Sequence, residues 1–229
     1  MPKKKSHQLQ TLLHSVIENY LSTGEPVWSK HLHDEDTIAY APSTIRKYLN
    51  ELEKQWLVYQ PYNSSGRVPT VQGLSNYIDT ILGKEAIVAQ EFDPYIFDVN
   101  YARNSLKFAV EGLGNYIEGV VVWFIHNDEY YFIGINKLLH QTSITEFETT
   151  KGIVDYIETK KIIELLGKKI IKKGQIYYTF IEEEKNAISC LYTKVNINWY
   201  ESLICAIWPL RSNYKNNLTV LTKFIQSLL

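Results

Sequence analysis

The spacing of apolar residues in the first 82 positions predicts a series of helices and a short strand. Apolar residues recur at helical intervals up to Trp56, and Leu57 to Gln60 then favours a strand. Thr23-Gly24 provides a left-handed cap for the first helix, and Thr70 provides an N-cap for the last. The predicted helices cover residues 8–22, a short stretch from Ser29, residues 42–56 and residues 71–82.

The third of these helices has two distinct faces and runs into a basic loop. Its apolar positions share one face: Ile45, Leu49, Leu52 and Leu57. Its polar positions share the other: Ser43, Thr44, Arg46, Lys47 and Asn50. The loop QPYNSSGRVPT (residues 60–70) follows, with a glycine hinge at Gly66. A helix, a short strand and a basic, glycine-hinged loop are typical of a winged helix-turn-helix, a unit that binds duplex DNA.

The start of the third helix and the loop contain the candidate DNA contacts. Arg46 is the best candidate to read a guanine, because its planar fork matches O6 and N7; the alternative is an ion pair with Glu51 or Glu53. Arg67 would reach a phosphate or the minor groove, or else make a capping or surface pair. The predicted DNA-binding residues are Ser29, Lys30, Ser43, Thr44, Arg46, Lys47, Asn50, Ser64, Ser65, Gly66 and Arg67.

The remainder of the chain predicts an α+β domain over residues 95–229, joined to the winged helix (residues 1–82) by a linker at 83–94. The run at residues 120–135 favours a hairpin turning at Asn127-Asp128, because its side chains are β-branched and aromatic. The predicted helices cover 101–116, 150–172 and 213–229, and three more strands cover 175–181, 188–197 and 200–208. Strands and helices in this order indicate an antiparallel sheet with flanking helices.

Composition favours a globular protein and constrains its compartment. The chain is 45% hydrophobic with a net charge of −1, and no stretch has the pattern of a signal peptide or a membrane span. We therefore expect a soluble cytoplasmic protein, associated with the nucleoid if it binds DNA. Residues 1–82 contain eight Lys/Arg and eight Asp/Glu, so any basic face is local, at Arg46, Lys47, Arg67 and a lysine arm, Lys3 to Lys5.

The sequence predicts neither an enzyme nor a metal or cofactor site. Glu182 to Glu184 form an acidic run without a neighbouring histidine, so we expect a solvated strand end. Cys190 and Cys205 have no metal-ligand spacing and are expected to be buried. Trp28 and Trp56 could stack on bases, but their apolar neighbours favour packing against the helical core.

Several blocks of residues resemble the family of the heat-inducible transcription repressor HrcA. TGEPVWSK (23–30) is similar to the family's turn between its first helices, STIRKYLNELE (43–53) to its recognition helix, and QPYNSSGRVPT (60–70) to its wing. The last 23 residues, from Ile207, resemble its closing segment, and IGINKLL (133–139) and EEE (182–184) its second-domain landmarks. Trp28, Tyr62-Asn63 and Ser75 depart from the family's usual Gly, His-Thr and Arg.

The resemblance implies a repressor of chaperone genes with a GAF-like second domain. It implies binding to the inverted repeat called CIRCE and a dependence on the chaperonin GroEL for the active fold. It also identifies the chain as a shortened member, with the family's dimerisation insert missing from the second domain. A homodimer is expected on physical grounds too, because one recognition helix with few charges gives limited affinity.

Two other functions remain open from the sequence. One is a winged-helix regulator of another operator whose GAF-like domain senses a ligand in a pocket lined by Trp123, Phe124, Tyr130 and Tyr131. The other is a module whose winged helix binds protein, which the neutral charge of residues 1–82 favours.

Overall fold

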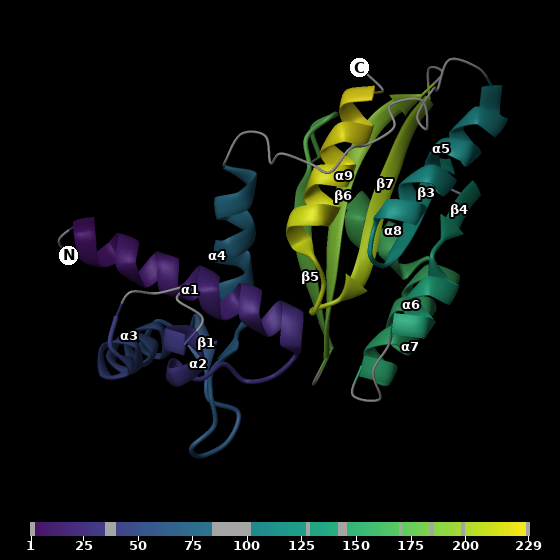
Figure 1. The fold of residues 1–229 in the computed structure, drawn as a ribbon. Coiled ribbons are helices and arrows are strands. Elements are labelled where there is room, and N and C mark those ends of the chain that lie inside the picture. Colours follow the sequence, from purple (N-terminus) through teal and green to yellow (C-terminus); the bar gives the residue numbers. More distant parts are fainter. Residues whose placement is uncertain are drawn as a thin grey trace. The chain divides into compact units, whose positions relative to one another are not determined.

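A computed structural model describes residues 3–34, 40–83, 102–126, 129–141, 146–169, 171–183, 186–197 and 200–227. The chain forms two compact units, Met1–Glu85 and Ala86–Leu229, which we describe separately (Figure 1). Nearly all of the predicted linker, residues 83–94, lies outside the described residues.

The first unit is a helical bundle with a small two-stranded sheet. Its elements are α1 (Lys3–Thr23), α2 (Ser29–Asp34), α3 (Pro42–Lys54), β1 (Val58–Tyr59), β2 (Val68–Pro69) and α4 (Val71–Leu82). Gly24 has a φ of 76°, which ends α1 as predicted, and the Thr70 hydroxyl accepts a hydrogen bond from the Gly73 backbone N–H at 3.0 Å. The three-helix, wing and fourth-helix order confirms the winged-helix prediction.

The core of the first unit comes from the apolar faces that the sequence predicts. Ile45, Leu49 and Leu52 of α3 are 4% exposed or less, and α3 packs against α1 and α2. The other side chains of this core include Leu12, Leu13, Val16, Ile17, Leu32, Val58, Leu74, Tyr77 and Ile78. Full burial of each aliphatic side chain stabilises the fold by about 1.5–3 kcal/mol, so the core holds α3 with its polar face outward.

Helix α3 ends in a Schellman motif with tryptophan at the left-handed position. The Trp56 N–H donates to the Glu53 carbonyl at 2.9 Å, and the Leu57 N–H donates to the Leu52 carbonyl at 3.1 Å. Trp56 has a φ of 58°, and its side chain is 74% exposed. The prediction that Trp56 and Trp28 pack against the core is therefore wrong, because the chain reverses at Trp56 and directs the indole into solvent; Trp28 is 51% exposed.

Replacing Trp56 with glycine is expected to raise the free energy of unfolding by about 0.5–1 kcal/mol. A left-handed conformation costs an L-residue about 1–2 kcal/mol, and glycine removes this cost. Part of the gain is lost because glycine has more conformational entropy in the unfolded chain. Trp56→Ala is the matched control, because alanine keeps the left-handed penalty and gains nothing. Urea unfolding of both variants measures the difference, and equal midpoints would contradict the strain at this residue.

The second unit is an antiparallel sheet with helices on both faces. The strand order is β4-β3-β7-β6-β5, and every neighbouring pair is antiparallel. The strands are β3 (Val120–His126), β4 (Glu129–Ile133), β5 (Tyr177–Glu183), β6 (Asn186–Ile197) and β7 (Tyr200–Pro209). The helices are α5 (Ala102–Tyr116), α6 (Ile135–Gln141), α7 (Phe147–Glu158), α8 (Lys161–Gly167) and α9 (Tyr214–Ser227). The predicted α+β class, an antiparallel sheet with flanking helices, is confirmed.

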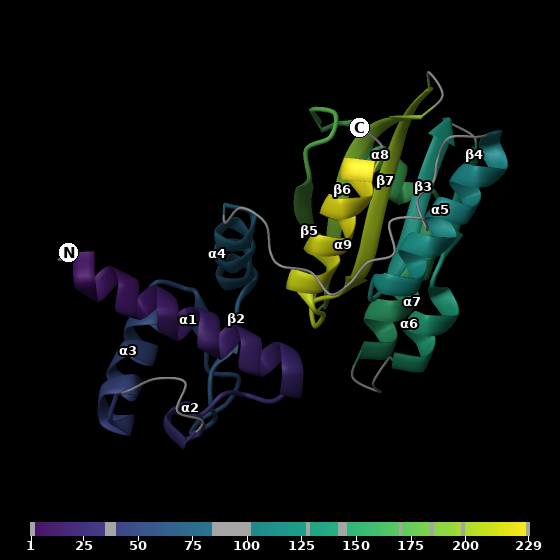
Figure 2. The same cartoon turned by 45° about the horizontal axis from the view of Figure 1, so that its top comes forward.

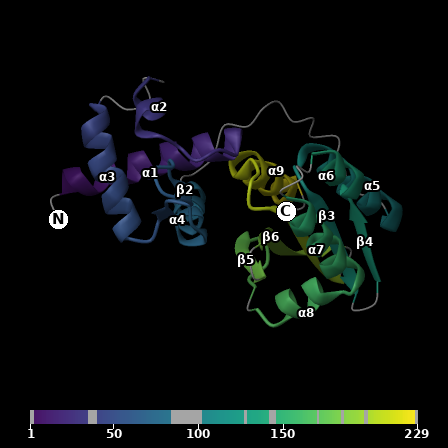
Figure 3. The same cartoon turned by 90° about the horizontal axis from the view of Figure 1, so that it is seen from below.

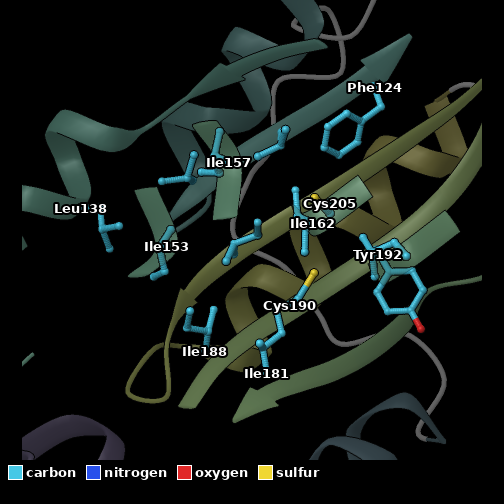
Figure 4. Close-up of a cluster of buried hydrophobic side chains, with 14 residues drawn as sticks. Phe124, Leu138, Ile153, Ile157, Ile162, Ile181, Ile188, Cys190, Tyr192 and Cys205 are labelled. Atoms are coloured by element: carbon cyan, nitrogen blue, oxygen red, sulfur yellow. The ribbon is translucent and has the colours of Figure 1, made fainter. Parts of the chain in front are cut away.

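Helices α5 and α9 cover one face of this sheet, and α7 and α8 cover the other (Figures 2 and 3). The core on the α7–α8 side contains Cys190 and Cys205, which are buried as predicted (Figure 4). Burial raises the pKa of the Cys205 thiol, so this cysteine stays protonated and packs as a small apolar side chain.

The aromatic residues proposed to line one ligand pocket lie on both faces of the sheet. Trp123 pairs with Tyr131, and Phe124 pairs with Tyr130 across β3 and β4. Because successive strand residues point to opposite faces, the two pairs cannot surround one cavity. Trp123 and Phe124 are also 1% and 5% exposed, as core side chains. The predicted pocket is therefore wrong.

A buried asparagine joins the start of α9 to the turn before β3. The Asn217 side chain, 0% exposed, accepts from the Glu118 N–H at 2.9 Å and donates to the Glu118 carbonyl at 3.1 Å. Its amide also donates to the Ser212 hydroxyl at 3.2 Å. The Glu118 carboxylate accepts from the Asn213 N–H at 3.0 Å, which satisfies a backbone donor just before α9.

Candidate nucleic-acid interface

The outer face of α3 is polar, basic and open at its N-terminal end. Ser43, Arg46, Lys47 and Asn50 are exposed, and Thr44 is partly exposed. Pro42 stands at the first turn, where its missing N–H costs nothing, and no described side chain caps this end of α3. Backbone donors and the helix dipole at such an end favour a phosphate. This geometry allows the residues at the start of α3 to approach a DNA groove.

Arg46 and Lys47 make no ion pair with the described residues. The two carboxylates considered as alternatives for Arg46 pair with other cations: Glu51 with the Lys5 amine at 2.9 Å and Glu53 with the Arg67 guanidinium at 2.9 Å. Arg46 therefore does not form the ion pair with Glu51 or Glu53 that was the alternative to DNA contact. Its guanidinium and the Lys47 amine stay available to an external acceptor.

The predicted lysine arm is part of a helix. Helix α1 begins at Lys3, and the Lys5 amine is bound to Glu51 of α3. The arm prediction is wrong for these positions, because residues from Lys3 onward continue the helical turn of α1. Lys5 therefore fixes α1 against α3.

The wing is anchored to the segment before α2. Val27 and Arg67 exchange both backbone hydrogen bonds, at 2.9 and 2.8 Å, so the wing gains a third extended segment beside the β1–β2 pair. Gly66 approaches the backbone of Pro26 and Val27 so closely that a Cβ atom would lie 2.6 Å from three of their atoms. Gly66 therefore allows the wing to lie close to the backbone of residues 26–27 of the same chain.

Ser65 is directed into the wing. It is 4% exposed; its hydroxyl donates to the Gly66 carbonyl at 3.1 Å, and its carbonyl accepts from the Gln60 amide at 3.0 Å. Outward contact by the Ser65 side chain is a prediction that the structure contradicts, because the hydroxyl already bonds inside the turn. Gly66 is buried with it, whereas Ser64 is exposed at the tip with a φ of 64°.

Replacing Gly66 with alanine is expected to lower the free energy of unfolding by about 1–3 kcal/mol, the usual cost of forcing an atom into a packed site. The methyl group meets backbone atoms, so the wing must separate from residues 26–27. Gly167→Ala is the control, because an added Cβ there has no neighbour within 4 Å. Thermal unfolding would contradict this packing if both variants melted alike.

Two other predicted DNA contacts belong to α2, which packs against α3. Lys30 of α2 is exposed, and Ser29 is partly exposed at the first residue of that helix. Sequence reasoning missed a set of exposed aromatic residues around the wing and the ends of α2 and α3: Trp28, Trp56, Tyr59 and Tyr62. Hydropathy alone predicts burial for such residues, so no local pattern indicated their exposure.

Comparison with known proteins finds repressors that resemble part of this chain. The heat-inducible transcription repressor HrcA of Anabaena sp. (strain L31) is 34% identical over 93 residues, and that of Tetragenococcus halophilus is 39% identical over 82 residues. These matches cover 41% and 36% of this chain. Over that part, the chain is similar to the HrcA repressors. The resemblance predicted from the winged-helix blocks is confirmed to that extent.

The match to HrcA covers only part of the chain, whereas one solved structure matches nearly the whole fold. The aligned part spans about a quarter of the HrcA relatives, 26% and 24% of their lengths. No family model matches the chain. A crystal structure of a protein described as hypothetical has a TM-score of 0.76 over 96% of both chains at 15% identity, which shows the same fold.

The described residues were also compared with the requirements of a membrane span and of a metal site. None of the described helices is long and apolar enough to span a membrane. Within the described ranges, no group of three or more His, Cys, Asp or Glu side chains could hold a metal ion.

Proposed function

We propose that the chain is a transcription repressor that binds double-stranded DNA through α3. The single observation that carries the proposal is the outer face of this helix, where Arg46 and Lys47 are exposed while the nearby carboxylates of Glu51 and Glu53 pair with other cations. Arg46 reads a base edge, and Ser43, Thr44 and Lys47 bind phosphates or neighbouring edges. The relatives are named as heat-inducible transcription repressors, which supports control of heat-shock genes.

The proposed complex is a homodimer on an inverted repeat of the CIRCE type. The first 82 residues carry no net positive charge, so one winged helix has a weak electrostatic attraction to DNA. Two copies on two half-sites sum their contacts, and the two-fold axis of the protein matches that of the repeat. The second unit is the proposed site of dimerisation and regulation, with the chaperonin GroEL as a proposed partner and the nucleoid as the place of action.

Selection from a pool of random duplexes tests the proposed function without assuming an operator. The purified protein is incubated with the pool, and the bound duplexes are sequenced over several rounds. Enrichment of two inverted half-sites at one fixed spacing is the expected result. Recovery of an unenriched pool, with the protein folded by circular dichroism, would overturn the proposal.

A protein partner is the second candidate function, because Trp28, Trp56, Tyr59 and Tyr62 expose large apolar surfaces on the first unit. Binding to a protein through these residues would be insensitive to salt and would survive Arg46→Ala. Binding to DNA would weaken steeply with salt. A salt series on Arg46→Ala therefore separates the two candidates.

A further inference from the structure

The side chain of Arg67 faces the recognition helix. Its guanidinium lies 2.9 Å from the Glu53 carboxylate and donates a hydrogen bond to the Asn50 amide oxygen at 3.0 Å. The Arg67 side chain is 13% exposed and the Glu53 side chain 37% exposed. Arg67 was a candidate DNA contact, but its charge is neutralised within the unit.

The backbone of Arg67 is fixed as firmly as its side chain. Its N–H and carbonyl both bond to Val27, at 2.8 and 2.9 Å, and the next residue, Val68, begins β2. Arg67 therefore connects the segment before α2, the base of the wing and the outer face of α3.

Withdrawing this arginine toward DNA would leave two groups without their partner. The Glu53 carboxylate would remain on the face that meets the phosphates, where its repulsion opposes binding. Asn50 would lose the contact that orients its amide, since a guanidinium only donates and holds the amide oxygen toward itself. Bound to Arg67, Asn50 directs its NH₂ group away from the guanidinium, as a donor for a DNA acceptor.

We propose that Arg67 is a positioning residue that locks the wing to the recognition helix and presents Asn50, and that it does not bind a phosphate. The proposal rests on the proposed function of the first unit as a DNA-binding winged helix. The Arg67–Glu53 pair sets the distance between wing and helix, and so the register in which both meet the duplex.

The test compares the DNA affinity of Glu53→Gln with that of Glu51→Gln. Both variants remove one negative charge from α3, but Glu51 pairs with Lys5 of α1, whereas Glu53 pairs with Arg67 of the wing. If the Arg67–Glu53 ion pair locks the wing to α3, Glu53→Gln binds a CIRCE-type duplex about threefold to fivefold more weakly than Glu51→Gln. This is the size expected for the loss of a partly exposed ion pair. A phosphate contact predicts the reverse, because Glu53→Gln frees the arginine and tightens binding.

A charge swap gives a second readout. In the double variant Arg67→Glu with Glu53→Arg, the ion pair between the wing and α3 is restored, although the new carboxylate cannot donate to the Asn50 amide oxygen. Affinity is therefore expected to recover above that of Arg67→Glu alone, with the salt slope of the parent. A lost phosphate contact lowers the salt slope by about one and is not rescued. Loss of rescue together with a lower slope would overturn the lock.

Amide hydrogen exchange tests the contact between the wing and α3 in the absence of DNA. The lock predicts faster amide exchange at residues 60–68 in Glu53→Gln than in Glu51→Gln, because the wing loses its attachment to α3. Equal exchange in the two variants would contradict it. If the parent protein binds no duplex but its wing loosens in Glu53→Gln, the proposed function fails and the lock stands.

Discussion

Arg46→Ala is expected to lower the affinity of the protein for its selected operator by about 5- to 150-fold, equivalent to about 1–3 kcal/mol. The Arg46 guanidinium is exposed on the polar face of α3 and has no ion pair among the described residues, so its donors are available to guanine O6 and N7. Fluorescence anisotropy on the operator and on duplexes with one altered base pair measures both affinity and preference. The preference should relax at one position in each half-site.

Lys47→Ala is the matched control for this result. Lys47 is exposed on the same turn and is expected to bind a phosphate, so its loss should weaken binding evenly across sequences and reduce the salt slope by about one. If Arg46→Ala instead behaved like Lys47→Ala, with no base position relaxed, Arg46 would be a phosphate contact. Unchanged affinity and preference would remove it from the interface.

Asn217→Ala is expected to lower the free energy of unfolding of the second unit by about 2–4 kcal/mol. The substitution leaves the Glu118 N–H and carbonyl without the fully buried amide that binds both. It also removes a partner of Ser212. Urea unfolding followed by tryptophan fluorescence measures the change, because Trp208 is buried against Tyr214 at the start of α9.

Asn216→Ala is the control for this stability effect. Asn216 is the preceding residue of α9, partly exposed, and its amide donates one hydrogen bond to the Tyr116 carbonyl at 2.8 Å. Water can replace that partner, so a loss of about 1 kcal/mol or less is expected. A similar loss in both variants would contradict the role assigned to the buried amide.

Local pattern predicted the elements of the first unit well. Helix α4 runs from Val71 to Leu82 as expected, because Thr70 caps it and its apolar residues keep a strict helical spacing. Helix α3 begins at Pro42 as predicted and ends two residues earlier than expected, at Lys54, since Gln55 and Trp56 form its cap. Such caps depend on backbone conformation, which the apolar period does not specify.

The second unit shows where periodicity is insufficient. The predicted helix over residues 150–172 is two helices, α7 and α8, separated by Lys160 with a φ of 59°. The apolar period continues across this break, so the sequence gives no sign of it. Helix α6, missed entirely, has seven residues after Gly134, and a stretch that short shows no clear period.

The sequence pattern predicted the exposed polar face of α3, but not the residues with which Arg67 of the wing pairs. The exposure of Arg46 and Lys47 follows from their spacing relative to the buried Ile45 and Leu49, so the polar face of α3 could be predicted from the sequence. Arg67 lies 17 residues from Asn50 and meets Glu53 only because the wing folds back on α3. A pairing of that kind comes from tertiary structure, and no local motif contains it.

The most direct test of DNA recognition by α3 is anisotropy of the purified protein with a CIRCE-type inverted repeat and with a shuffled duplex of equal composition, over a salt series. We predict tighter binding to the repeat at every salt concentration, a steep salt slope, and a stoichiometry of two chains per duplex. Equal, weak binding to both duplexes, together with a failure to enrich any inverted repeat from the random pool, would contradict operator recognition by this helix.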